Sequence, residues 1–178
     1  MELKIWESCY NRGYELDNIS NEELSKAMHK NLEMVGGVIY DAEEKAFAEK
    51  LSQSFGSKSV PIESAAKIQP FGYSHTNASA DTGDVSWVVP TAGMTTATYV
   101  PGTPGHSWQA VSCTNSSIGF KGMMIAAKTM TMTAMDFFTD SQLLEAGKKE
   151  FNEKRGPNFK YESLVGNIPP PLDIRKNK

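Results

Sequence analysis

One irregular stretch, residues 77–122, divides this chain between two regions of helical character. The stretch concentrates Gly, Pro, Ser and Thr around Asp81, Asp84 and His106. On both sides of it, apolar residues recur every three or four positions, which is the spacing of an amphipathic helix. Loops that are held in place by regular elements often carry binding and catalytic residues. We therefore expect the functional residues of this chain to lie within residues 77–122.

Two helices are predicted before this stretch. Ser20 and Glu23 have the spacing of a capping box at the start of the first helix, and Gly36 and Gly37 end it. Asp41 caps a second helix that continues to residue 55. The residues expected on the inner face of this second helix are Ala46, Phe47, Leu51 and Phe55.

Two more helices are predicted after residue 117. A long buried helix covers residues 121–138, and a last helix starts at Asp140 or Ser141 and ends at Arg155. The residues expected to bury the long helix are Met123, Ala126, Ala127, Met130, Ala134, Phe137 and Phe138. Residues 156–178 include the sequence NIPPPLD, which favours an extended tail along the surface.

Three short segments have the composition of β-strands. Residues 3–10 alternate loosely between apolar and polar side chains, and residues 85–90 and 94–100 are rich in β-branched and aromatic residues. Pro90, Pro101 and Gly102 interrupt the last two segments. Helices that alternate with a few strands indicate an α/β fold.

Composition excludes several classes of function. A chain of 178 residues with 39% hydrophobic residues can form one domain with a buried core. Its 18 basic and 21 acidic residues are spread along the chain, so no basic face favours a nucleic-acid partner. No apolar run is long enough to cross a membrane, and the first residues lack the apolar core of a signal peptide. Cys9 and Cys113 are far apart and favour reduced thiols, so we expect a cytoplasmic protein.

His106, Asp81 and Asp84 are residue types that bind zinc or manganese through imidazole nitrogen and carboxylate oxygen. Their spacing is equally compatible with a structural role, in which the aspartates cap turns and His106 bonds a backbone carbonyl. A nucleophilic pair of His106 with Cys113 or Ser107 is less favoured, because residues this close in sequence rarely face each other. His29 and His75 lack a second ligand at a suitable spacing and are predicted to be surface histidines.

Three motifs within and after the irregular stretch resemble those of a known family. The sequences SADTGDVSWVVPTA, VPGTPGHSWQAVS and SIGFKGMMIAAKTM are similar to the C-terminal part of aminobenzoyl-glutamate utilization protein B and its relatives. These are metal-dependent amidohydrolases of the aminoacylase/carboxypeptidase class. The motifs occur in the family's order and near its spacing, and the resemblance extends from residue 3 to about residue 151.

This resemblance implies a partial zinc-peptidase-like catalytic domain, with a few-stranded mixed sheet packed by about four helices. Residues 1–10 would be a remnant strand of an inserted lid or dimerisation domain, residues 11–155 the C-terminal portion of the catalytic domain, and residues 156–178 the tail. In such enzymes two zinc or manganese ions activate a water that attacks an amide carbonyl, and a glutamate acts as general base. The substrate class is aminobenzoyl-glutamate or an acyl-amino acid.

The resemblance also assigns roles to individual residues. His106 matches the family's last metal ligand. Asp81 and Asp84 match acidic positions that orient ligands or line the pocket, and we expect Thr103 and Ser107 to line the same pocket. Phe120 is a departure, because the family motif usually carries a histidine at this position.

The family's remaining metal ligands and its general base lie in an N-terminal portion that has no counterpart in this sequence. We therefore predict that the chain alone is inactive and holds metal weakly or not at all. Two interpretations follow. The chain is active with an N-terminal half or a homologous subunit as its partner, or it is a non-catalytic remnant or interaction module. Exposed apolar surface would then favour association, including homo-oligomers.

Overall fold

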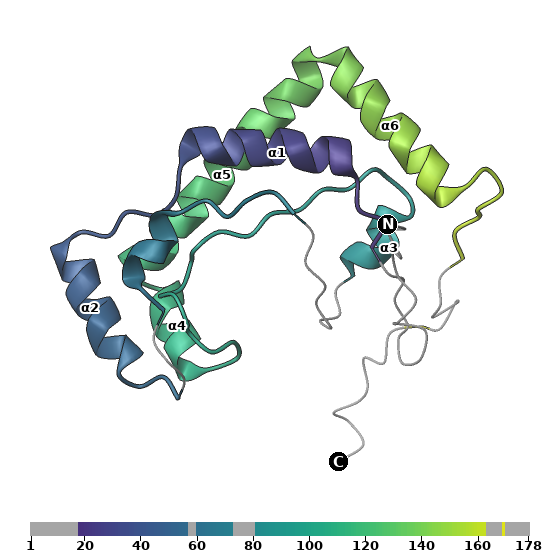
Figure 1. Cartoon of the computed structure of the whole chain (residues 1–178). Coiled ribbons are helices and arrows are strands. Elements are labelled where there is room, and N and C mark those ends of the chain that lie inside the picture. Colours follow the sequence, from purple (N-terminus) through teal and green to yellow (C-terminus); the bar gives the residue numbers. More distant parts are fainter. Residues whose placement is uncertain (1–17, 57–59, 73–80, 163–168, 170–178) are drawn as a thin grey trace.

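The computed structural model describes residues 18–56, 60–72, 81–162 and 169, and every structural statement below concerns these residues. They form six α-helices and one short 3-10 helix, arranged as an arch (Figure 1). In chain order the elements are α1 (Glu22–Val35), α2 (Ala42–Ser52), η1 (Ile62–Ala66), α3 (Thr82–Ser86), α4 (Trp108–Thr114), α5 (Ser117–Thr139) and α6 (Ser141–Arg155). The long helix α5 spans the arch, α1 crosses it, and α2 and α4 lie in one arm while α3 and α6 lie in the other.

The predicted α/β fold with a mixed sheet is wrong for the described residues, which contain no β-strand. Their only β-type pairing is an isolated parallel bridge between Ser20 and Thr91. Part of the predicted strand 85–90 is helical in α3, and residues 94–100 form no strand. In Figure 1 residues 91–100 run as a long irregular stretch, which we call the extended segment, and within it the Thr98 amide donates to the Thr96 carbonyl at 2.9 Å. Extended backbone becomes a strand only beside a second strand, and β-branched composition cannot supply that neighbour. The predicted strand 3–10 lies outside the described residues.

The four long helices were predicted at nearly their observed positions, but one cap was assigned to the wrong residue. Asn21 caps α1, because its side-chain oxygen accepts the Leu24 amide at 3.1 Å. Glu150 accepts the next two orphan amides, those of Glu22 and Glu23, at 2.8 and 3.0 Å. A carboxylate from α6 therefore takes the role that the Ser20–Glu23 capping box was expected to have. The predicted cap of α2 by Asp41 is confirmed.

The core lies where α2, η1, α4 and the start of α5 meet. Its buried members are Val38, Tyr40, Ala48, Leu51, Phe55, Ala65, Val100, Cys113 and Ile118. Leu51 and Phe55 are inward as predicted, whereas Ala46 is exposed and Phe47 is 37% exposed. Their place on the inner side of α2 is taken by Ala48 and by Glu44.

Helix α5 is rotated relative to the prediction. Its buried residues include Gly122, Thr129 and Thr133, whereas Met123 and Met130 are more than half exposed. The contact with α1 is polar: the Asn31 side-chain amide donates to Thr133 Oγ1 at 3.2 Å and to Asp136 Oδ2 at 2.7 Å. The small side of α5 therefore packs against the rest of the chain, and its apolar side faces outward.

Gly122 allows the extended segment, at Ala97 and Thr98, to lie directly on α5. A Cβ atom at this position would be 2.5 Å from the Ala97 carbonyl oxygen and 2.9 Å from the Thr98 Cα. No side chain fits at such distances unless the backbone moves.

We expect Gly122→Ala to lower the free energy of unfolding by about 1–3 kcal/mol, because overpacking against backbone outweighs the higher helix propensity of Ala. Gly147→Ala is the matched control: its Cβ would meet the tip of the Leu24 side chain at 2.7 Å, which can move aside. Urea denaturation followed by circular dichroism measures the free energy of unfolding of both variants. Equal stability of Gly122→Ala and the wild type would contradict the close contact.

An ion pair between the buried Glu44 and the half-exposed Lys121 joins α2 to α5. Glu44 is 4% exposed, and its carboxylate accepts from Lys121 Nζ, which also donates to the Ile39 carbonyl at 3.1 Å. Burial alone would raise the pKa of Glu44. The hydrogen bonds from Lys121, Ser117 and the Asp41 amide lower it by more than burial raises it, so the pKa of Glu44 is below its ordinary value. The charged carboxylate therefore stabilises the fold.

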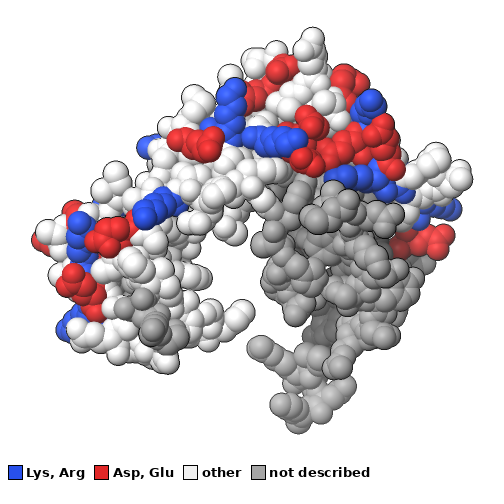
Figure 2. All heavy atoms as spheres, viewed as in Figure 1, with Lys and Arg blue, Asp and Glu red and all other residues white. Residues whose placement is uncertain are grey.

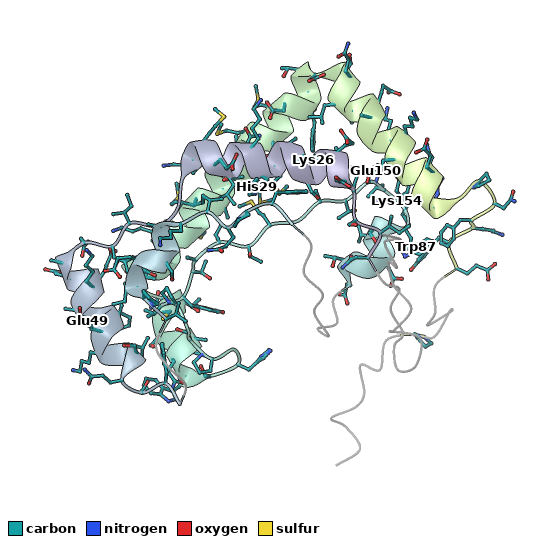
Figure 3. The ribbon with its side chains drawn as sticks, viewed as in Figure 1. Lys26, His29, Glu49, Trp87, Glu150 and Lys154 are labelled. Atoms are coloured by element: carbon teal, nitrogen blue, oxygen red, sulfur yellow. The ribbon has the colours of Figure 1, made fainter. Side chains whose placement is uncertain are left out.

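This shift determines the sign of a pH dependence. A carboxyl whose pKa is lowered in the folded state contributes stability above its unfolded pKa and loses it as the pH falls through the folded pKa. We expect Glu44→Gln to reduce the loss of stability on acidification below about pH 4.5, the ordinary value of this group. Glu49→Gln, an exposed carboxylate on the same helix (Figure 3), should leave the acid dependence unchanged. Identical melting curves against pH for both variants would contradict the assignment.

Candidate functional site

His106 lies on a turn between the extended segment and α4, and its backbone has an uncommon conformation. Its φ is 53°, which makes it the one residue other than glycine with a positive φ among those described. Such backbone is strained for a residue with a Cβ and is often found at functional positions. The residue is exposed, and its imidazole forms no hydrogen bond within the described part of the chain. Both ring nitrogens are therefore available to a ligand.

The two polar neighbours of His106 hold the turn in place. Thr103 donates to the Val100 carbonyl through its amide at 3.0 Å and its hydroxyl at 2.6 Å. Ser107 caps α4 by accepting the Ala110 amide at 3.2 Å, and its hydroxyl donates to the Pro104 carbonyl at 2.6 Å. Thr103 and Ser107 thus position the His106 backbone.

Asp81 and Asp84 lie at the start of the short helix α3. Asp81 immediately precedes the helix and is exposed, and its side chain forms no capping hydrogen bond. Asp84 Oδ1 is buried and has no hydrogen-bond partner among the described residues. Ser86 fastens α3 to the start of α1, since its hydroxyl accepts the Ile19 amide at 2.9 Å and donates to the Gly83 carbonyl at 2.6 Å. A buried carboxylate oxygen without a donor is a position that a further polar group can satisfy.

The structure does not bring the predicted site residues together. α3 and α4 lie in opposite arms of the arch, so the aspartates are on one side and His106, at the start of α4, is on the other (Figure 1). Within the described ranges, no three His, Cys, Asp or Glu side chains are grouped so that they could hold a metal ion. These residues by themselves therefore do not fit a zinc or manganese site. Cys113 is a free thiol buried in the core, which removes it as a nucleophile beside His106.

The two tryptophans of the irregular stretch have different environments. Trp87 packs against Phe159, with ring centroids 4.5 Å apart (Figure 3). Trp108 is 63% exposed at the start of α4. Trp87 therefore contributes to packing, whereas Trp108 is largely exposed to solvent.

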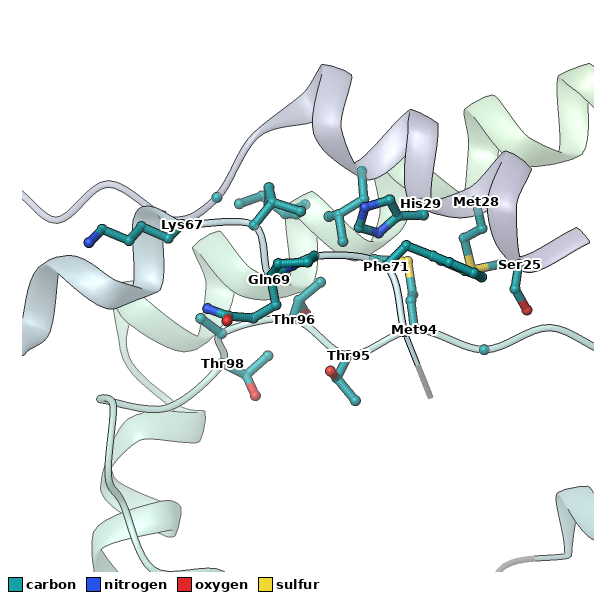
Figure 4. Close-up of a pocket in the computed structure, with 18 of the residues that line it drawn as sticks. Ser25, Met28, His29, Lys67, Gln69, Phe71, Met94, Thr95, Thr96 and Thr98 are labelled. Atoms are coloured by element: carbon teal, nitrogen blue, oxygen red, sulfur yellow. The ribbon is translucent and has the colours of Figure 1, made fainter. Parts of the chain in front are cut away.

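An open groove of about 980 Å³ runs under α1, between residues 67–72 and the extended segment (Figure 4). His29 lines it, although the sequence predicted an ordinary surface histidine. The imidazole of His29 meets the Phe71 ring edge-on at 5.5 Å, and its Nε2 is 3.3 Å from Glu33 Oε1. The remaining wall is formed largely by threonines and apolar side chains, among them Met94 and Thr96. No Asp or Glu is among the described residues that line the groove, and such a lining can bind a chain segment.

The charged side chains that Figure 2 shows gather on α1, α2 and α6, and large parts of the surface carry none. Acidic and basic side chains alternate along α1, α2 and α6 without forming a continuous basic region. Among the described helices, none combines the length and the apolar character needed to cross a bilayer.

The comparisons with known proteins agree with the motifs. No family model and no solved structure matches this chain. The chain is, however, a distant homologue of a hydrolase that is named for aminobenzoyl-glutamate. That relative is a p-aminobenzoyl-glutamate hydrolase subunit from Escherichia coli (strain K12), and the two sequences are 31% identical over 160 residues. The match covers 76% of this chain and 33% of the relative, so the chain spans about a third of the relative's length. The resemblance inferred from the three motifs is confirmed.

Proposed function

We propose that this chain is the C-terminal portion of a metal-dependent amidohydrolase that cleaves the amide bond of aminobenzoyl-glutamate or of an acyl-amino acid. The homology to the E. coli p-aminobenzoyl-glutamate hydrolase is the observation that carries this proposal. In this assignment residues 11–155 form part of a catalytic domain, residues 1–10 a strand of an inserted lid or dimerisation domain, and residues 156–178 a tail.

His106 is the residue of this chain that would contact a zinc or manganese ion. Its exposed imidazole, presented on a strained turn, supports this role. Asp84 would accept a hydrogen bond from a neighbouring ligand through its unpartnered buried oxygen, and Asp81 would line the pocket. Thr103 and Ser107 keep the turn that carries His106 in position.

The rest of the site must come from outside the described residues. A two-metal centre needs about five protein ligands and a general base, and one histidine and two aspartates on separate arms cannot supply them. We assign the remainder to a complementary polypeptide, defined as the part that corresponds to the roughly two thirds of the E. coli relative that this chain does not match. When bound, the metal would polarise the amide carbonyl and activate water.

A second candidate function is a non-catalytic interaction module. The separation of the predicted site residues and the many exposed large apolar side chains favour it. In this case the chain binds a partner through apolar surface, and His106 has no catalytic role.

We expect turnover of p-aminobenzoyl-glutamate only when the chain is co-expressed with the complementary polypeptide and supplied with zinc or manganese. A chelator should abolish it. Asp84→Asn should lower kcat/KM by about 10- to 100-fold, the usual effect of losing a group that orients a metal ligand, and His106→Ala by more. Release of p-aminobenzoate is the readout.

Turnover by the chain alone would contradict the need for a complementary polypeptide. A stable but inactive complex would favour the interaction module.

A further inference from the structure

Within the described residues, helix α5 has a second, exposed face that is largely apolar, with Thr131 as a polar member. Its large members and their exposed fractions are Phe120 51%, Met123 54%, Met124 50%, Met130 57%, Met135 56% and Phe138 87%. At 100° per residue these positions fall on one side of the helix, with Ala127 and Ala134 between them. Lys128 is the single charged residue between Lys121 and Asp136. We call these eight apolar residues the methionine face.

The methionine face is not needed to hold α5 in place. The opposite side of the helix already packs against α1, where Thr129 and Thr133 are buried, and against the extended segment at Gly122. A helix with a packed side and a separate apolar side is ready to contact a second body.

The methionine face is large for an exposed apolar surface. Side chains of this size have roughly 150–250 Å² each, so six that are half exposed or more present on the order of 600 Å². The largest apolar patch on a typical monomer is about 300–600 Å² and is often functional, and a stable interface buries about 800 Å² on each partner, so the methionine face can form most of one.

We propose that the methionine face is the docking surface for the complementary polypeptide, an inference that rests on the proposed function. The extent of the apolar surface identifies this occupant. Further exposed apolar side chains lie on α4, at Trp108 and Val111, and at Val85 of α3 and Val88 just after this helix. These helices lie in opposite arms of the arch (Figure 1). A second copy placed by a two-fold axis on α5 covers one face, whereas a polypeptide about twice the length of the matched region can cover several.

The backbone of the extended segment supports the same occupant. The amides of residues 93–97 donate no hydrogen bond within the described part of the chain. The segment is nevertheless held at both ends, by the bridge between Ser20 and Thr91 and by the Tyr40 hydroxyl, which donates to the Tyr99 carbonyl at 3.4 Å. Residues 93–97 are exposed or half-buried, so water can satisfy these amides in the free chain. An extended polypeptide can pair with such a fixed row of amides while its side chains cover apolar surface.

The test replaces one methionine of this face with a charge. Met130→Glu should leave the fold of the chain unchanged, because Met130 is exposed. It should weaken binding of the co-expressed complementary polypeptide at least about tenfold, since docking would bury an unpaired carboxylate. Met34→Glu is the matched control: Met34 is 66% exposed at the end of α1, and this variant should bind like the wild type. Met130→Leu should also retain binding.

Binding is measured by affinity capture and sedimentation without metal or substrate, and circular dichroism monitors folding. An inactive complex that Met130→Glu weakens would support the docking surface and contradict the proposed hydrolase activity. An active complex whose assembly is insensitive to Met130→Glu would support the proposed hydrolase activity and contradict the docking surface. Failure of the folded wild-type chain to bind the complementary polypeptide would overturn the docking proposal. A concentration-dependent homodimer of the chain that Met130→Glu abolishes would also overturn the docking proposal, because a second copy would then occupy the methionine face.

Discussion

The contact between α5 and α1 determines the form of the whole described structure. It uses the small and polar side of α5, where a threonine row meets Asn31, and so turns the methionines outward. At the other end of α1, the Asn21 side-chain amide donates to the Gly147 carbonyl at 2.8 Å, and Glu150 accepts two α1 amides. These bonds attach α6 to α1. Together the two contacts determine the arch, because the two arms lie on opposite sides of the point where α1 crosses α5 (Figure 1).

The same crossing explains why the predicted site is divided. α3 is tied to the start of α1 through Ser86, whereas the turn with His106 leads directly into α4 at the opposite end of α5. The two groups therefore lie on opposite sides of the crossing (Figure 1). In the proposed enzyme, a site that uses both would be completed by a polypeptide placed between or beside the arms. The exposed apolar side chains on α3, α4 and α5 are the surfaces such a body would contact.

Local signals in the sequence predicted the four long helices well, whereas the short helices α3 and α4 were missed and tertiary features were predicted poorly. The bounds of α1, α2, α5 and α6 follow from spacing and caps, which act within a few residues. The strands were wrong because pairing depends on a neighbour distant in sequence. The inward face of α5 was wrong because hydrophobic periodicity identifies an apolar side without telling what covers it. The strained backbone at His106 had a partial signal in the Pro-Gly turn before it, and the role of Glu150 as a cap for α1 had none.

The most direct test of the central claim is whether His106 is a metal ligand in the assembled protein. We would measure zinc binding by equilibrium dialysis for the complex with the complementary polypeptide, with wild-type chain and with His106→Ala. We expect stoichiometric binding by the wild-type complex and a marked loss of affinity in the variant, with the complex still intact by sedimentation. Equal zinc affinity in the two complexes would show that His106 is not a ligand and would contradict the proposed role of this chain.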